Sequence, residues 1–274
     1  GQDRPPALVI RGLQKTFVTR SGLVKPRRRV EAARAIDLTI FRGDTLAVVG
    51  ESGSGKSTLA RMVLRLIEPD AGEILFDGAD VRTMGREALR QFRRKAQIVF
   101  QDPYASLDPR LKVGETIMRG PMAFGTSKAR ARDIAARGLE RVGLGSGALD
   151  RFPHEFSGGQ RQRICIARAL ALEPTFLIAD EAVSALDVSV QAQVLELLAE
   201  LKAALGMTMH FITPDLRVAR EIADRIVVMQ QGAIVEQASA ADLFASPKSD
   251  YTRRLLDAVP GRNFFAGRQM EEAI

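Results

Sequence analysis

The sequence is short of residues that several classes of protein require. It contains a single cysteine, Cys165, which excludes an intramolecular disulfide and a cysteine-ligated zinc or iron–sulfur site. It contains no tryptophan, and no aromatic residues interleave its basic runs, so stacking platforms for single-stranded nucleic acid are lacking. No apolar run approaches the roughly 18–20 residues of a membrane-crossing helix, and the first residues carry no hydrophobic signal core. We therefore expect a cytoplasmic protein.

The residues that are present suit a globular α/β protein with a basic surface. With 274 residues, of which 46% are hydrophobic, the chain is long enough for one large α/β domain with embellishments or for two small domains. The formal net charge is +7, and basic residues cluster at 25–29 and 93–95. Such charge permits nucleic acid or an anionic membrane as a neighbour, but short basic clusters are usually solvated faces. Charge alone therefore does not indicate nucleic-acid binding.

Residues 50–58 are the most informative part of the chain. They match the phosphate-loop pattern G-x-x-x-x-G-K-[ST] in full, with a short apolar run before them and a helical pattern after them. In order they are Gly50, Glu51, Ser52, Gly53, Ser54, Gly55, Lys56, Ser57 and Thr58. A strand, a glycine-rich turn and a helix start aim backbone N–H groups at an anion, while the lysine reaches phosphate oxygens and Ser57 ligates Mg²⁺. The segment predicts binding of a nucleoside triphosphate.

Strands and helices alternate around this loop. We expect strands at 8–10, 35–40, 45–49, 72–78, 175–179, 207–213, 225–229 and 233–236, and helices at 86–97, 127–142, 159–172, 189–205 and 216–223. The basic segment 18–34 is expected to be a long loop or an extended hairpin, and the chain has few periodic features from residue 246 onward. The alternation predicts a largely parallel sheet with ligand at the carboxyl ends of its strands.

A second motif is an apolar strand at 176–181 that ends in two carboxylates. Adjacent side chains near a strand end diverge, so two separate roles are plausible for them. Asp180 is suited to hold the Mg²⁺ shell, usually through water, and Glu181 to polarise an attacking water. An apolar strand that ends in two carboxylates is common and does not indicate a function by itself. It indicates a nucleotide site here because the chain also contains an intact phosphate loop.

A third motif lies upstream of this strand and begins a second helix. It consists of Ser157, Gly158, Gly159 and Gln160. Serine is a good helix N-cap, and the glycines expose backbone N–H groups. The chain therefore carries two helix-start anion sites but only one complete nucleotide cradle.

Together, the three motifs resemble those of the ATPase subunits of ATP-binding cassette (ABC) transporters, over residues 7–240. The resemblance implies a P-loop NTPase, RecA-like core with a mostly parallel sheet, an N-terminal antiparallel β subdomain and an inserted α-helical subdomain. It implies a cassette domain at 7–245, with the helical subdomain at about 102–160, and a C-terminal extension at 246–274. The expected ligands are ATP and Mg²⁺.

The resemblance also implies roles for single residues. Residues 157–160 would lie against the γ-phosphate of ATP held by a partner's phosphate loop, so that two subunits close head-to-tail around two nucleotides. Gln101 would contact Mg²⁺ and relay motion to membrane subunits, and Asp187 would couple the two sites. Phe17 falls where an aromatic residue stacks on adenine, although tyrosine is more usual there, and an ordinary strand residue is the alternative. The expected catalytic residues are Glu181, Gln101 and Lys56.

A narrower resemblance points to the oligopeptide, dipeptide and nickel importer branch of the family. It rests on residues 101–110, 187–193 and 251–260. In that branch, two ATPases that are often non-identical sit below two membrane-spanning permease subunits, with a separate solute-binding protein outside the cell. The resemblance therefore implies an ATPase that powers import of peptides or related small solutes, placed peripherally at the cytoplasmic face of the membrane.

One position departs from the family pattern. The family has a histidine after the strand that follows Glu181, and this chain has Pro214 there. Proline offers neither a side-chain donor nor a backbone N–H. His154 and His210 do not replace it, and each is expected to be a packing or surface residue. A degenerate site in a heterodimer, an introduced substitution and compensation by another group all remain open as explanations.

Two other functions compete with the leading one. The chain could be a catalytically degenerate ATP-binding partner in a heterodimeric transporter, which Pro214 supports and the intact Lys56, Asp180 and Glu181 oppose. It could instead be a soluble cassette protein that acts on nucleic acid, although such proteins usually carry two cassettes or a long coiled coil. We expect no nucleic-acid partner.

Overall fold

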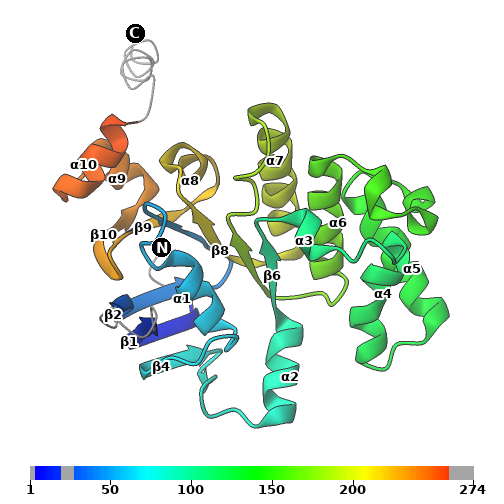
Figure 1. The fold of residues 1–274 in the computed structure, drawn as a ribbon, viewed down its shortest axis with the longest axis horizontal. Helices are drawn as coiled ribbons and strands as arrows, with labels where there is room; N and C mark the ends of the chain where they lie inside the picture. The colour runs from blue at the N-terminus through cyan, green and yellow to red at the C-terminus, as the bar shows by residue number, and fades with distance from the viewer. Residues whose placement is uncertain (1–3, 20–27, 259–274) are drawn as a thin grey trace.

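A central, mostly parallel sheet organises the molecule (Figure 1). The computed structural model describes residues 4–19 and 28–258. The strand order in this sheet is β10-β9-β3-β8-β7-β6, and only β10 runs antiparallel to its neighbour. The strands are β3 (Thr45–Val49), β6 (Ala96–Phe100), β7 (Phe176–Asp180), β8 (Thr208–Thr213), β9 (Arg225–Gln230) and β10 (Ala233–Ser239). The predicted fold class is confirmed.

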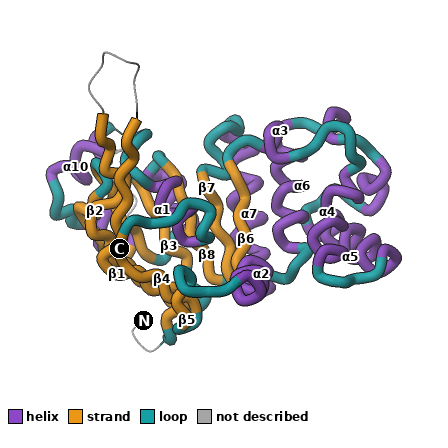
Figure 2. The backbone as a smooth tube through the Cα atoms, turned by 60° about the horizontal axis from the view of Figure 1, so that its bottom comes forward, coloured by secondary structure: helices purple, strands orange, loops and turns teal. Residues whose placement is uncertain are grey.

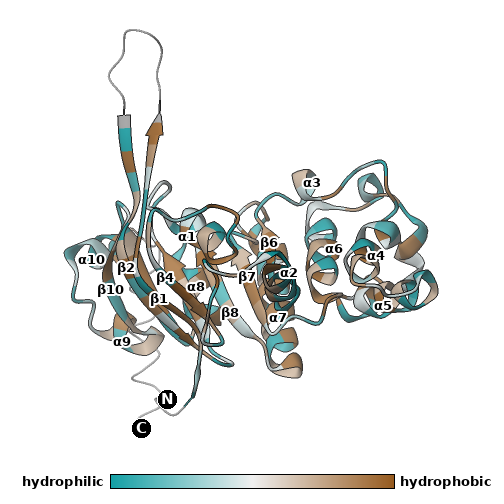
Figure 3. Cartoon of the chain, turned by 90° about the horizontal axis from the view of Figure 1, so that it is seen from below, coloured by the Kyte–Doolittle hydropathy of each residue, from teal (hydrophilic) through white to brown (hydrophobic). Residues whose placement is uncertain are grey.

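A second, antiparallel sheet packs beside the first, in the order β2-β1-β4-β5 (Figures 2 and 3). Its strands are β1 (Pro6–Thr19), β2 (Arg28–Phe41), β4 (Ala71–Phe76) and β5 (Ala79–Asp80). Of the two possibilities for segment 18–34, the hairpin is the one observed, because β1 and β2 stay paired out to Thr19 and Arg28. The tip of that segment, including most of the basic cluster at 25–29, lies outside the described residues.

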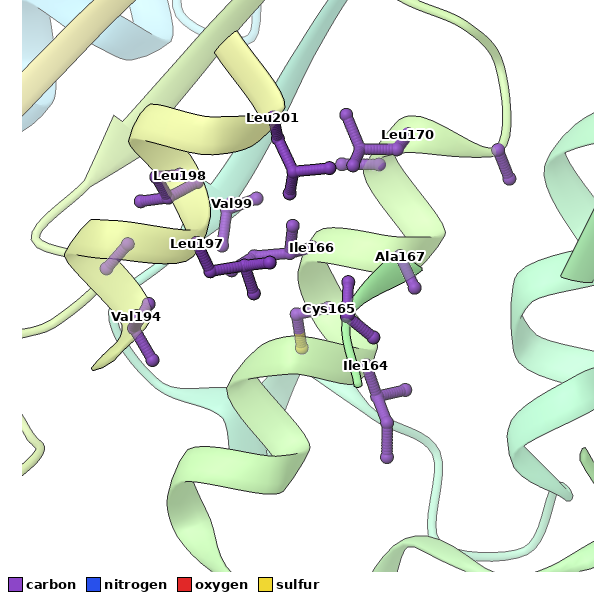
Figure 4. Close-up of a cluster of buried hydrophobic side chains, with 14 of the residues drawn as sticks. Val99, Ile164, Cys165, Ile166, Ala167, Leu170, Val194, Leu197, Leu198 and Leu201 are labelled. Atoms are coloured by element: carbon purple, nitrogen blue, oxygen red, sulfur yellow. The ribbon is translucent and has the colours of Figure 1, made fainter. Parts of the chain in front are cut away.

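The central strands are apolar because both of their faces are covered. Every residue of β3, β7 and β8 is buried, and parallel strands with two covered faces read as continuous hydrophobic runs. One face packs on the antiparallel sheet and on α1 (Lys56–Val63). The other face packs on α6 (Gly158–Leu170) and α7 (Val188–Leu205), whose side chains meet Val99 of β6 (Figure 4).

The remaining helices form a peripheral arm and the edges of the core. The arm lies beyond β6 and consists of α3 (Pro103–Ser106), α4 (Val113–Ala123), α5 (Lys128–Arg141) and two short 3-10 turns, η1 (Ser146–Asp150) and η2 (Pro153–Glu155) (Figure 1). Elsewhere lie α2 (Arg86–Lys95), α8 (Leu216–Ile222), α9 (Ala240–Ala245) and α10 (Asp250–Asp257). Among the described helices, none combines the length and apolarity needed to cross a membrane.

The start of the C-terminal extension differs from its expectation. Residues 250–257 form the amphipathic helix α10, whereas few periodic features were expected from residue 246 onward. Tyr251 and Leu256 of this helix join a buried cluster with residues of β3, β9 and α8. Tertiary contact with the core therefore stabilises this helix, and eight residues would not be stable in isolation. Residues 259–274 lie outside the described part of the chain.

His210 is a buried histidine in the middle of β8. Its side chain is fully buried, and neither ring nitrogen has a hydrogen-bond partner in the part of the chain that the structure describes. Burial lowers the pKa of His210 to about 4. The expectation of a packing residue is consistent with this position, since His210 pairs in register with Leu46 and Ile178 inside the sheet.

We predict that His210→Leu stabilises the protein and removes an acid sensitivity. An unpaired buried polar group costs about 1–3 kcal/mol, so the free energy of unfolding at pH 7 should rise by about 1 kcal/mol. A histidine titrates near 6.5 in the unfolded chain. The unfolded state therefore binds the extra proton first, and the wild type loses stability as the pH falls from about 6.5 to about 4. Between these two pH values, the advantage of the variant in free energy of unfolding should therefore grow by up to about 3 kcal/mol.

Urea denaturation at several pH values measures this difference. His154→Leu is the matched control, because His154 is exposed in η2 and its replacement leaves the buried position in β8 untouched. Parallel loss of stability in wild type and His210→Leu below pH 6 would contradict the prediction.

Candidate functional site

The carboxyl ends of three parallel strands bring the motifs together. In the register of the sheet, Val49 at the end of β3 pairs with Thr213 of β8, and Asp180 at the end of β7 pairs with Ile212. The phosphate-loop segment, the two carboxylates and Pro214 therefore all lie at the carboxyl ends of the parallel strands. This end of an open α/β sheet is where such sheets bind their ligands.

The backbone of the phosphate loop passes so close to its neighbours that two positions accept only glycine. A Cβ on Gly50 would lie 2.2 Å from the Met229 carbonyl oxygen, and one on Gly55 would lie 2.1 Å from the Ala32 carbonyl oxygen. Gly55 also has a φ of +103°, which L side chains rarely adopt. The glycine pattern therefore reflects packing as well as access for a ligand.

Lys56 is folded into the loop. Its side chain is buried, and Nζ donates hydrogen bonds to the Gly50 carbonyl at 2.6 Å, the Glu51 carbonyl at 2.9 Å and the Ser54 hydroxyl at 3.3 Å. Burial lowers the pKa of Lys56, and the nearby carboxylates of Glu181 and Asp180 partly oppose that shift. The ammonium group is thus held beside the first turn of α1.

The start of α1 fits an anion. No side chain among the described residues caps this helix start, and its first turn contains no acidic residue. The free N–H groups of a helix start carry a partial positive charge, which favours phosphate oxygens. Together with Lys56, this uncapped turn suits a polyphosphate.

Ser57 and Asp180 join the first two motifs directly. The Ser57 hydroxyl donates a 2.6 Å hydrogen bond to Oδ1 of Asp180, which is buried at the end of β7. A hydroxyl and one carboxylate suit Mg²⁺, which usually takes few protein ligands and completes its shell with water and substrate phosphates. No cluster of three or more acidic, histidine or cysteine side chains suited to a metal occurs within residues 4–19 and 28–258.

Glu181 is half-buried and occupies a rare backbone conformation. Its φ is +52°, and its N–H donates to the Ile212 carbonyl at 2.9 Å. Such a left-handed residue is held by its surroundings at an energetic cost, and residues of this kind gather at functional sites. Both the Glu181 and Asp180 carboxylates act on Lys56, so the two lie at the same site.

The third motif lies elsewhere on the sheet. Ser157 is exposed and caps α6, accepting from the Gln160 N–H at 3.3 Å, while the Gln160 side chain accepts from the Ser157 N–H at 3.0 Å. Gly159 packs tightly, because a Cβ there would lie 2.3 Å from Val190 of α7. Within the described chain, no hydrogen bond joins residues 157–160 to residues 50–58. The helices α1 and α6 lie over different parts of the sheet (Figures 1 and 2).

The other predicted site residues occupy loop and strand positions. Gln101 is exposed directly after β6, and Asp187 caps α7 by accepting from the Val190 N–H at 3.0 Å. Phe17 lies on β1, where its ring is 38% exposed and 5.6 Å from Nζ of Lys15. Pro214 is exposed at the end of β8.

One contact of the loop was not foreseen from the sequence. The phenol oxygen of Tyr251 in α10 accepts a hydrogen bond from the Glu51 N–H at 3.1 Å. The two residues are 200 positions apart. The segment containing Tyr251 contributed to the resemblance, but no sequence pattern pairs it with the loop.

Comparison with known proteins decides the family. The ABC transporter family profile matches residues 33–184. The chain belongs to the ABC transporter family. A putative peptide import ATP-binding protein of Brucella ovis is 52% identical over 256 residues, which is 93% of this chain and 79% of that protein. The glutathione import ATP-binding protein GsiA of Shigella flexneri is 48% identical over 94% of this chain and 42% of its own length.

Solved structures agree with this assignment. The ABC cassette MJ0796, in a dimeric post-hydrolysis state bound to ADP and Pi, matches with a TM-score of 0.74 at 29% identity and covers 85% of this chain and 98% of its own. The cbiO1 subunit from Clostridium perfringens matches with a TM-score of 0.77 at 27% identity, over 97% of this chain and 99% of its own. The ABC resemblance seen in the sequence is confirmed, and the protein is an ATPase of this family that uses ATP.

We predict that Gly50→Ala destabilises this ATPase by about 1–3 kcal/mol, because the new methyl group overlaps a backbone carbonyl and the strand end must shift. Urea denaturation measures the loss. Gly147→Ala is the matched control, since Gly147 is exposed and its Cβ would meet nothing within 4 Å. Equal stability of Gly50→Ala and the control would contradict the prediction, because it would show that the backbone beside Gly50 can move to make room for a methyl group.

Proposed function

We propose that this ATPase powers the import of peptides or related small solutes across a membrane. The relatives named for peptide and glutathione import support this class of solute. The proposed partners are a second, non-identical ATPase, two membrane-spanning permease subunits and, indirectly, an extracytoplasmic solute-binding protein. The chain would lie peripherally at the cytoplasmic face of the membrane, where its net charge of +7 favours anionic lipid headgroups.

The observation that carries the hydrolytic part of this proposal is the hydrogen bond between Ser57 and Asp180. It places the hydroxyl that would ligate Mg²⁺ against the carboxylate that would support its shell, with Glu181 at the next position. Bound Mg²⁺ would supply charge neutralisation at the β- and γ-phosphates. In this proposal Lys56 holds the same phosphates, and Glu181 accepts a proton from the attacking water.

The remaining assignments extend this nucleotide site. Residues 50–58 would hold the phosphates through backbone N–H groups, with Gln101 at the metal and Phe17 against the adenine ring. Asp187 would couple two such sites. Exposure of Gln101 and partial exposure of Phe17 leave both side chains able to reach a ligand.

A head-to-tail dimer would use the third motif. Ser157 and Gln160 are exposed at the start of α6, and in the described chain no hydrogen bond ties residues 157–160 to residues 50–58. A second subunit would therefore bring its own phosphate loop against the Ser157 motif, trapping ATP between two chains. The dimeric state named for the MJ0796 cassette supports this arrangement.

The helical arm is the proposed contact with the permease. A cavity of about 840 Å³ opens between the arm and the core, and its lining includes Tyr104, Asp108, Arg110, Arg119 and Arg168. A helix from a membrane partner would fit such a groove.

The proposed boundaries are 7–245 for the cassette, about 102–160 for its helical part and 246–274 for the extension.

The first test is to purify the tagged chain from membranes and to compare it with Glu181→Gln. Both should copurify with two membrane-spanning proteins and a second ATPase. The variant should lose about 10²- to 10⁴-fold in kcat for ATP, because the proton acceptor is removed, while its Kd for MgATP stays within about twofold.

Glu196→Gln is the matched control, since Glu196 is exposed on α7 and far along the helix from the site. Copurification with ribosomes or DNA instead of membrane proteins would refute the importer. Full activity of Glu181→Gln would refute the role of this carboxylate.

A second candidate function is a catalytically degenerate ATP-binding partner, and Pro214 is the observation that favours it. Its position at the end of β8, level with the ends of β3 and β7, is where a side-chain donor would reach the γ-phosphate. In this case the chain's own site binds MgATP and hydrolyses it slowly, while its Ser157 motif serves the neighbouring site.

We predict that Pro214→His accelerates single-site ATP hydrolysis in the assembled complex by about 30- to 1000-fold. This range corresponds to about 2–4 kcal/mol for one positioned contact to the transition state. Single-turnover measurement gives the rate. Pro214→Ala is the control, because it removes the ring without adding a donor. No gain with histidine, or an equal gain with alanine, would contradict the prediction.

A further inference from the structure

One peptide group of the phosphate loop is held from both sides. The carbonyl of Gly50 accepts a 2.6 Å hydrogen bond from Nζ of Lys56, and the N–H of Glu51 donates a 3.1 Å hydrogen bond to the phenol oxygen of Tyr251. These two atoms belong to the same planar trans peptide, so they point in opposite directions. Fixing the N–H therefore fixes the direction of the carbonyl that receives the lysine.

Tyr251 is itself firmly placed. Its side chain is only 5% exposed and packs in the buried cluster that contains Val49, the residue before the loop. Its backbone N–H donates to the Ser249 hydroxyl, the N-cap of α10, at 3.2 Å. The phenol ring therefore reaches the loop from a packed helix and cannot swing away without opening that cluster.

A buried carboxylate anchors the start of the same helix. Glu236 of β10 is 8% exposed and accepts hydrogen bonds from the N–H groups of Lys248 at 2.8 Å and Ser249 at 2.9 Å. Charge-assisted bonds to a buried carboxylate are stronger than neutral ones. The helix α10 is thus fastened to the edge strand β10 of the central sheet through the two residues just before it, and to the phosphate loop through its second residue.

We propose that Tyr251 is a positioning residue for ATP binding. By holding the Gly50–Glu51 peptide, it keeps the loop in the conformation that receives phosphates and keeps Lys56 inside it. A loop ordered in advance loses less conformational freedom when ligand binds, and so binds more tightly. This inference rests on the proposed role of residues 50–58 as the phosphate cradle, and it makes the C-terminal extension part of the nucleotide site.

The test uses the full chain and Tyr251→Phe, which removes one oxygen and keeps the packing of the ring. The Kd for MgATP, measured by titration calorimetry, should rise about 2- to 12-fold, the range that one net hydrogen bond represents. The single-turnover hydrolysis rate at saturating ATP should stay within about twofold, because no reacting atom is touched. The Glu51 amide proton should also exchange with solvent faster than in the wild type.

Leu256→Val is the matched control for a purely structural effect. Leu256 lies in the same helix and the same buried cluster, and losing one methylene loosens the helix without touching the phenol. This variant should melt at a lower temperature and keep the wild-type Kd. An unchanged Kd in Tyr251→Phe, or an equal rise in both variants, would overturn the inference. A wild-type chain that fails to bind MgATP would instead overturn the proposed phosphate cradle.

Discussion

The parallel pairing of β3, β8 and β7 is the constraint on which the whole site depends. Its register sets Val49 level with Thr213 and Asp180 level with Ile212, so the loops that follow these strands emerge together. A slip of one residue would reverse the faces of an entire strand. It would also separate Ser57 from Asp180, whose hydrogen bond spans 2.6 Å. The pairing of these buried strands therefore positions the chemistry at their ends.

The sequence predicted the parts of the structure that local chemistry determines. The phosphate loop, the Asp180–Glu181 strand end and the Ser157 helix start each depend on residues that are neighbours in the chain. Most of the longer helices and five of the central strands followed from their periodicity, with boundaries that shifted by a few residues. The strand β6 and the helices α4 and α9 were not among the expected elements, and the helix expected at 86–97 ends at Lys95, where β6 begins. The hairpin was one of two possibilities for the basic insertion, and β1 and β2 proved longer than the apolar runs that indicated them.

What the sequence did not predict depends on contacts between distant segments. The helix α10 packs on a cluster formed by β3, β9 and α8, and its hydrogen bond to the loop joins Tyr251 with Glu51, 200 positions away in the chain. The left-handed conformation of Glu181 is likewise invisible in the sequence, since glutamate has no preference for it. Packing of β7 against β8, including the bond from Glu181 to the Ile212 carbonyl, holds that conformation in place. Both the position of α10 and the conformation of Glu181 therefore depend on contacts with the central sheet and are not evident from the residue types alone.

The close approach at Gly159 has a mechanical consequence. With no room for a methyl group between this residue and Val190, the starts of α6 and α7 are in direct contact, and farther along the two helices share one apolar core (Figure 4). Neither end can slide past the other without opening a void. Ser157, which caps the first helix, and Asp187, which caps the second, are therefore held at a spacing that this close contact sets.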